Sequence, residues 1–379
     1  MIYLDHNATT PIDPAVREAM EPYLAQEWGN ASSSYSFGSR LRAVVETARL
    51  KVARLLNASP DEVVFTSGGT EANNAAIHAA LLADPARRHI VTTAVEHSSV
   101  LAYCQWLKSR GNPVTIVGVS ADGRLDYDAL EAAITKNTAI VSVMWANNET
   151  GVLFPVDRIA NQCHQLGVPF HSDAVQVAGK IPIDVKAAPF TYLGLAAHKF
   201  NGPKGIGVLY VRRGAPFTPL VHGGHQERGR RGGTEDVAAI VGLGLAAEKA
   251  AASAGDYARI VAPRRDRLES ALLERCGPAR IHGRTEPRIA NTTNISFPGI
   301  GADGLLMMLD KYDVYASAGS ACLADSGEPS HVIAAMRGSP QIPRDFVRLS
   351  IGAATTEDEI NEAIQRIGDC VGSLRQLSA

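Results

Sequence analysis

Short apolar runs alternate with helical patterns along the middle of the chain, from residue 63 to residue 211. Each apolar run has the length of a buried strand and is bounded by turn-forming residues. Strands are predicted at 63–66, 89–95, 114–119, 139–145, 168–171, 191–197 and 205–211. Helices are predicted at 70–82, 98–110, 127–134 and 156–166. This alternation predicts an α/β fold built on a mostly parallel sheet.

The last two of these runs are joined by a short connection. Only about seven residues separate 191–197 from 205–211, whereas a parallel crossover needs a dozen or more. This pair is therefore expected to be antiparallel, and the sheet to be mixed.

The composition shifts beyond this sheet. Residues 233–262 are rich in Ala and predict a long helix, which Gly255 and Pro263 are expected to interrupt or end. A second α/β pattern follows. Strands are predicted at 294–297 and 348–351. Helices are predicted at 303–309, 331–337 and 357–377. This pattern predicts a smaller C-terminal domain.

Bulk composition is that of an ordinary globular protein. The chain has 379 residues, of which 45% are hydrophobic and 20% charged, with a net charge of −2. Such a balance gives no electrostatic case for nucleic acid or a membrane surface. The first residues have no signal-peptide pattern, and the five cysteines are scattered without a CxxC pair, so a reducing cytoplasm is expected.

Polar clusters follow several of the predicted strands. They lie at 66–71, 96–98, 147–151, 171–176 and 198–199. Because strand ends at one edge of an open α/β sheet converge on one crevice, these clusters are expected to meet. Each has an ordinary alternative on its own: helix capping, a turn, a structural aspartate or a solvated loop lysine.

Taken together, the clusters suggest one cofactor. Lys199, at the end of a buried strand, suits a Schiff base to an aldehyde. The glycines at 68–69 open a helix whose N-terminus suits a phosphate. Asp173 could pair with a protonated pyridine nitrogen, and the imidazole of His97 could stack on a ring. These are the parts needed to bind pyridoxal 5′-phosphate (PLP).

A lone cysteine stands in a loop-like stretch nearer the C-terminus. Residues 316–331 are small, Gly-containing and interrupted by a proline, and Cys322 lies among them. A thiol on such a loop is a candidate nucleophile, with an incidental cysteine as the alternative. No metal site is expected, because His222 and His225 lack further ligands at a suitable spacing.

The chain closely resembles the cysteine desulfurases of the NifS and IscS type. These belong to the class V aminotransferase family of fold-type I PLP enzymes, and the match is closest to the nitrogen-fixation branch. The motifs that carry the resemblance lie at 3–11, 67–71, 145–151, 172–176, 198–199, 223–231 and 319–322. The family architecture implies a large domain at 14–255 and a small domain formed by 1–13 and 256–379, which carries the cysteine loop.

The resemblance also implies a role for each matching residue. Lys199, Cys322 and His97 would be catalytic: Lys199 holds PLP and moves the Cα proton, and Cys322 accepts sulfur. Asn148 and Arg348 would bind the substrate carboxylate. The implied cofactor-binding residues are Gly69, Thr70, His97, Asp173, Gln176, His198, Lys199 and Thr234, with Thr234 reaching the cofactor of a second subunit.

The implied activity converts L-cysteine to L-alanine and supplies sulfur for iron–sulfur cluster assembly. The implied partners are a second copy of the chain and a scaffold or other sulfur acceptor. The sequence departs from the family at Ala196, where a phosphate-binding serine is common, at 323–326, and at Ala353, where an arginine is common. A selenocysteine lyase, an aminotransferase and a non-catalytic sulfur carrier remain alternatives.

Overall fold

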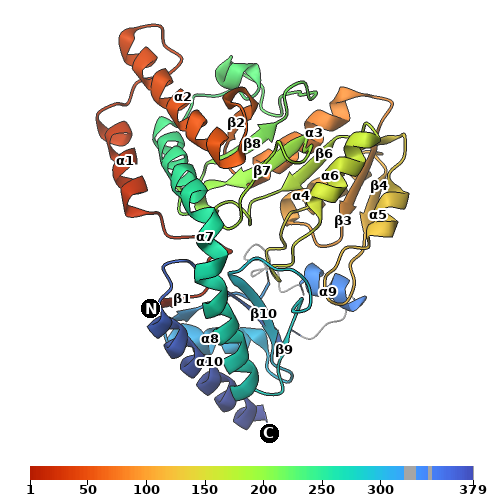
Figure 1. Cartoon of the computed structure of the whole chain (residues 1–379), viewed down its shortest axis with the longest axis vertical. Coiled ribbons are helices and arrows are strands. Elements are labelled where there is room, and N and C mark those ends of the chain that lie inside the picture. Colours follow the sequence, from red (N-terminus) through yellow and green to blue (C-terminus); the bar gives the residue numbers. More distant parts are fainter. Residues whose placement is uncertain (320–329, 340–343, 379) are drawn as a thin grey trace.

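The computed structural model describes residues 1–319, 330–339 and 344–378. Figure 1 shows a larger upper part and a smaller lower part, with helix α7 running through both. The helices of the upper part are α1 (Pro14–Ala25), α2 (Ser36–Leu56), α3 (Gly69–Ala83), α4 (Ser98–Ser109), α5 (Tyr127–Ala133) and α6 (Val156–Gln165). Short 3₁₀ turns lie at η1 (Pro60–Glu62), η2 (Ala197–Lys199) and η3 (Gln226–Gly229).

A seven-stranded sheet forms the centre of the upper part, in the order β2-β8-β7-β6-β5-β3-β4. Its strands are β2 (Val63–Thr66), β3 (His89–Thr93), β4 (Val114–Val117), β5 (Thr138–Ser142), β6 (Phe170–Asp173), β7 (Tyr192–Ala196) and β8 (Gly207–Val211). Strand β8 is antiparallel to both neighbours, and the other pairs are parallel. The predicted mixed, mostly parallel sheet and its antiparallel final pair are confirmed.

The lower part contains a second, smaller sheet arrangement. Strands β9 (Arg280–Ile281), β10 (Thr292–Ser296) and β12 (Phe346–Ser350) form an antiparallel sheet, and β1 (Ile2–Tyr3) pairs in parallel with β11 (Val314–Tyr315). Helices α8 (Ala302–Lys311), α9 (His331–Arg337) and α10 (Glu357–Ser378) complete it. The N-terminal strand thus joins a sheet whose other members come from the end of the chain.

Helix α7 (Val237–Arg275) is longer than the sequence pattern predicts. The prediction that Gly255 and Pro263 interrupt or end this helix is wrong, because the helix continues through both residues. A proline removes one helical hydrogen bond, but packing on both sides of it outweighs that loss. The first half packs on α1 and α2, and the second half packs on α10 with Val261, Leu268 and Leu272 buried.

Two separate groups of buried apolar side chains accompany the two parts. One lies around the seven-stranded sheet, with a further cluster on its α3 and α4 side. The other joins Ile2 and Leu4 to side chains of α7, β10, β12 and α10. Helix α7 is apolar and long enough to cross a membrane, but 61% of its most apolar window is buried inside the protein, as in a core helix.

Candidate functional site

A cavity of about 230 Å³ lies where the carboxyl ends of the large sheet face the N-terminal segment and β12. It collects side chains from segments that are far apart in the sequence. The predicted site residues that line it are Gly69, Thr70, His97, Asn148, Asp173, Gln176, His198, Lys199 and Arg348. The expected convergence of strand-end clusters is therefore observed.

Lys199 enters the cavity from the turn that follows β7. Its Nζ donates to the backbone carbonyls of Asn7, at 2.6 Å, and Ala8, at 2.8 Å. These carbonyls belong to the N-terminal segment, which crosses between the two parts of the molecule. The amine is thus held by uncharged acceptors beside the cavity, where it can meet a ligand.

Asp173 ends β6 and presents its carboxylate to the same cavity. Its Oδ2 accepts from Asn73 Nδ2 at 2.7 Å, and its Oδ1 accepts from the backbone N–H of Val175 at 2.9 Å. Asn73 also donates to Ser99 Oγ. The carboxylate is buried and fixed by hydrogen bonds, while the remaining lone pairs of its oxygens can accept from a ligand.

The loop before α3 comes very close to the sheet. A Cβ at Gly207 of β8 would lie 2.6 Å from the backbone carbon of Gly68, so only glycine permits this approach. Gly68 has φ +154°, and α3 begins directly after it. The helix start at Gly69 and Thr70 therefore borders the cavity, where backbone N–H groups and the helix dipole favour an anion.

Two histidines border the cavity. His97 caps α4, where its Nδ1 accepts from the backbone N–H of Ser99 at 3.2 Å, so the ring proton lies on Nε2. Burial lowers the pKa of His97, and burial with Lys199 nearby lowers the pKa of His198 to about 4. Both rings are consequently neutral near pH 7.

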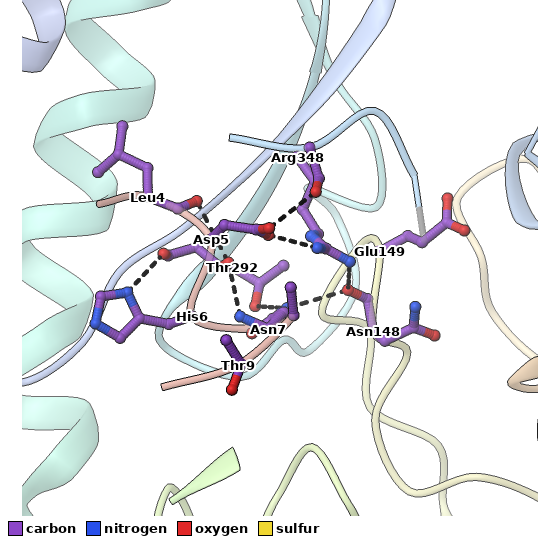
Figure 2. Close-up of polar contacts among 12 residues, drawn as sticks. Leu4, Asp5, His6, Asn7, Thr9, Asn148, Glu149, Thr292 and Arg348 are labelled. Atoms are coloured by element: carbon purple, nitrogen blue, oxygen red, sulfur yellow. Dashed lines mark hydrogen bonds and ion pairs between the residues drawn. The ribbon is translucent and has the colours of Figure 1, made fainter. Parts of the chain in front are cut away.

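Arg348 reaches the cavity from β12 on the opposite side. Its Nη2 donates to Asp5 Oδ1 at 2.5 Å and its Nη1 to the carbonyl of Asn148 at 3.1 Å. Figure 2 shows this guanidinium between Asp5 and the 148–149 loop. The side chain is only 1% exposed, and its Nε has no hydrogen-bond partner among the described residues. A buried donor without an acceptor suits a carboxylate ligand.

Comparison with known proteins gives one consistent answer. Residues 2–362 match the aminotransferase class-V family. A cysteine desulfurase of Trichormus azollae is 49% identical over 378 residues, which cover all of this chain and 94% of that protein.

Two solved structures share the fold. A NifS-like protein superposes with a TM-score of 0.92 at 34% identity, over 98% of this chain and all of that one. A structure described as SspA in complex with cysteine has a TM-score of 0.82 at 33% identity, over 94% of this chain and all of that one.

The chain belongs to the aminotransferase class-V family. The predicted family and its fold-type I architecture are confirmed. Ala196, where a serine is common in the family, lies in the cavity wall. Its methyl group supplies no hydrogen-bond donor there.

Thr234 is not among the described residues that line the cavity. Thr234 is exposed at the end of the loop that precedes α7, so its reach toward a second subunit remains a prediction. Cys322 lies outside the described residues. His222 and His225 belong to no group of three or more potential metal ligands within the described ranges.

Several residues of this class-V site escaped prediction. Asn7 is the most connected: its Nδ2 donates to the carbonyl of Asn148 and to Thr292 Oγ1, and its own carbonyl accepts from Gln176 and Lys199. Figure 2 shows Asn7 between Asn148 and Thr292. The other unpredicted contributors are Asp5, Asn73, Ser99 and Lys180. A signal for Asn73 was available, since it lies one helical turn after Gly69 on the same face of α3.

Proposed function

We propose that this chain is a PLP-dependent cysteine desulfurase, which converts L-cysteine to L-alanine and moves the sulfur to Cys322 as a persulfide. The observation that carries the proposal is the meeting of Lys199, Asp173 and Arg348 in one cavity. An amine, a buried carboxylate and a buried guanidinium are the groups that an amino-acid-transforming PLP enzyme needs. The family and the cysteine desulfurase relatives support the same reaction.

The residues present fit this cofactor. The helix start at Gly69 and Thr70 would hold its phosphate, Asp173 its ring nitrogen, and Gln176 its ring oxygen. The helix start can pack this closely against Val175 only with a glycine at position 69, because a Cβ there would lie 2.8 Å from Val175 Cγ2. His97 would cover the ring and Lys199 would hold the cofactor covalently. Thr234 would reach the phosphate of the cofactor bound to a second subunit.

The cofactor, when bound, supplies a sink for the electrons left behind when a proton leaves the substrate Cα. Arg348 and Asn148 bind the substrate carboxylate, which fixes the Cα–H bond toward Lys199. The amine of Lys199 would take the Cα proton. The Cys322 thiolate would then attack the substrate sulfur, so that an S–S bond forms as the Cβ–S bond breaks. The electron pair of the broken bond stays with Cβ, which takes a proton, and return of a proton to Cα completes L-alanine.

The remaining cysteines do not compete for this role. Cys104, Cys163, Cys276 and Cys370 are all buried. Burial raises the pKa of Cys104 and Cys163 to about 12, which keeps them as thiols. A thiol is a poor nucleophile compared with a thiolate, so the assignment to Cys322 gains support.

The wider setting belongs to the same proposal. We infer a cytoplasmic homodimer that passes sulfur to an iron–sulfur scaffold or another acceptor protein, with a large domain at 14–255 and a small domain at 1–13 and 256–379. Most residues of the two apolar clusters follow this division, whereas Val332, Ile333 and Met336 of α9 pack in the cluster around the large sheet.

The test is turnover of L-cysteine by the purified protein. We expect equal amounts of L-alanine and transferred sulfur, with an added sulfur atom on Cys322 in the mass spectrum. Cys322→Ala should keep the cofactor absorption but release no sulfide, and Lys199→Ala should lose that absorption. Turnover of L-selenocysteine alone, or of an amino acid and keto acid pair, would contradict the proposal.

A further inference from the structure

A buried lysine behind the cavity is unused by the mechanism. Lys180 lies in the turns that follow β6 and is only 4% exposed. Its Nζ donates to Gln176 Oε1 at 3.0 Å and more distantly to Asn7 Oδ1 at 3.5 Å. Within the described part of the chain, no carboxylate forms an ion pair with it.

Such a lysine is costly for the fold. Two amide oxygens replace water only in part, and a buried ammonium without a counter-ion is strongly disfavoured. Burial, followed by the nearby charges of Lys199 and Arg348, lowers the pKa of Lys180 to about 7. A hydrophobic side chain of similar length would fill the same space at no electrostatic cost. The retained amine therefore indicates a task beyond packing.

The task follows from what Lys180 does to Gln176. A side-chain amide can turn by half a rotation, which exchanges its donor and acceptor ends. Here the Oε1 end faces Lys180, and the Nε2 end donates to the carbonyl of Asn7 at 3.0 Å. Lys180 lines a neighbouring cavity of about 440 Å³, whereas Gln176 lines the cavity that contains Asp173, and Lys199 lies between the two and lines both. The second N–H of Gln176 is thus left for the cavity that contains Asp173.

Lys199 makes this arrangement relevant to the cofactor. Its Nζ shares the Asn7 carbonyl with Gln176 Nε2. When Lys199 leaves this carbonyl to hold a cofactor, Gln176 retains Lys180 and Asn7 as its two partners. A donor is then presented beside the reactive amine, where an anionic ring oxygen requires one.

We propose that Lys180 is a positioning residue for Gln176: its Nζ holds the amide oxygen on the far side, so that the amide N–H donates to an anionic oxygen of the bound cofactor. This inference rests on the proposed PLP dependence. It assigns to Lys180 no contact with substrate or cofactor.

The experiment is a double-mutant cycle read by cofactor binding. Wild type, Lys180→Met, Gln176→Ala and the double variant are stripped of cofactor, and PLP is titrated back while the visible absorption is recorded. Lys249→Met is the matched control, because Lys249 lines the same neighbouring cavity but pairs with Asp13. Lys180→Arg is the rescue variant, since it retains charged donors and the neighbouring cavity offers room.

We expect Lys180→Met to weaken PLP binding about tenfold and to shift the absorption of the bound cofactor, because a charge-assisted hydrogen bond is lost. Lys180→Arg should restore the wild-type spectrum, and Lys249→Met should leave it unchanged. In the Gln176→Ala background, adding Lys180→Met should change the affinity by less than about twofold, because the two residues act as one unit.

Two results would overturn the inference. One is a Lys180→Met protein that binds PLP as the Lys249→Met control does. The other is an equally large effect of Lys180→Met in the Gln176→Ala background, which would mean that Lys180 acts independently of Gln176. A wild-type protein that takes up no PLP would instead refute the proposed function itself. Thermal unfolding of each variant verifies that it is folded.

Discussion

Asp5 and the buried Arg348 form a partly buried ion pair that joins the N-terminal segment to β12. Arg348 Nη2 donates to Asp5 Oδ1 at 2.5 Å, and Ser317 Oγ donates to the other oxygen of Asp5 at 2.9 Å. Asp5 thereby orients the guanidinium of Arg348, and Ser317 in turn holds the carboxylate of Asp5 in place. Its free Nε is left for a ligand.

Replacing Asp5 by Asn should therefore weaken substrate binding more than turnover. The amide keeps the shape but not the charge, so Arg348 is held less firmly. We expect the KM for L-cysteine to rise about tenfold while kcat changes by less than about twofold, as for loss of a hydrogen bond between charged groups. Asp303→Asn, which disrupts an exposed pair with Arg344, is the control. An unchanged KM in Asp5→Asn would refute the positioning role.

Asn73→Ala should reduce cofactor retention, because Asp173 loses the amide that fixes its Oδ2. We expect the affinity for PLP to fall about tenfold, measured by titration of the stripped protein. Asn74→Ala provides a close control. Asn74 occupies the next position of α3 and donates to the carbonyl of Ser99 without touching Asp173. Equal losses in the two variants would show that only the helix had been disturbed.

Glu227→Ala should destabilise the fold. Glu227 accepts two hydrogen bonds from Arg49 and one from the backbone N–H of Phe65, and both charged side chains are 3% exposed. Removing Glu227 leaves the buried guanidinium of Arg49 with the exposed Glu46 as its remaining ion-pair partner, and loss of the buried partner costs about 3–5 kcal/mol in the free energy of unfolding. Urea titration measures this loss.

Glu46→Ala is the matched control for that experiment. Glu46 also pairs with Arg49, but its side chain is 43% exposed. Exposed pairs contribute at most about 1 kcal/mol. A loss in Glu227→Ala no greater than in Glu46→Ala would contradict the predicted role of burial.

Acid should destabilise the protein through His171. This side chain is fully buried on β6, and burial lowers its pKa to about 3. The unfolded chain binds a proton below about pH 6.5, whereas the folded chain does so only near pH 3, so stability falls as the pH drops through this range.

A variant isolates this contribution. Between pH 7.5 and 5.5, wild type should lose about 1.4 kcal/mol more free energy of unfolding than His171→Gln, because one proton is taken up over about one pH unit. Urea titrations at both pH values measure the difference. Parallel losses in the two proteins would exclude His171 as a source of acid sensitivity.

The sequence pattern predicted the strands and helices of the large sheet well, because each is a local run of apolar or helical residues. It also placed the chemistry of Lys199 and Asp173, since both follow strands that end at the same edge of the sheet. The pattern predicted an end of helix α7 before Pro263, whereas packing against α10 overrides this local preference and the helix continues. Helices α1 and α2 were missing from the prediction.

The contacts of Asn7, Asp5 and Lys180 were beyond reach of local patterns. Asn7 meets Asn148, Gln176 and Thr292 only after the whole chain has folded. Nothing in the residues next to Asn7 specifies those partners. A buried lysine such as Lys180 likewise has the same sequence appearance as a solvated one.

The pairing of the first strand with late segments sets an order of events during synthesis. The backbone of Asn7 bonds to Ser350, from which it is separated by 343 positions, and β1 pairs with β11. On the ribosome the seven-stranded sheet can form before the end of the chain has been made. Strand β1 and the backbone N–H of Asn7, which are made first, reach these partners only after nearly the entire polypeptide has emerged.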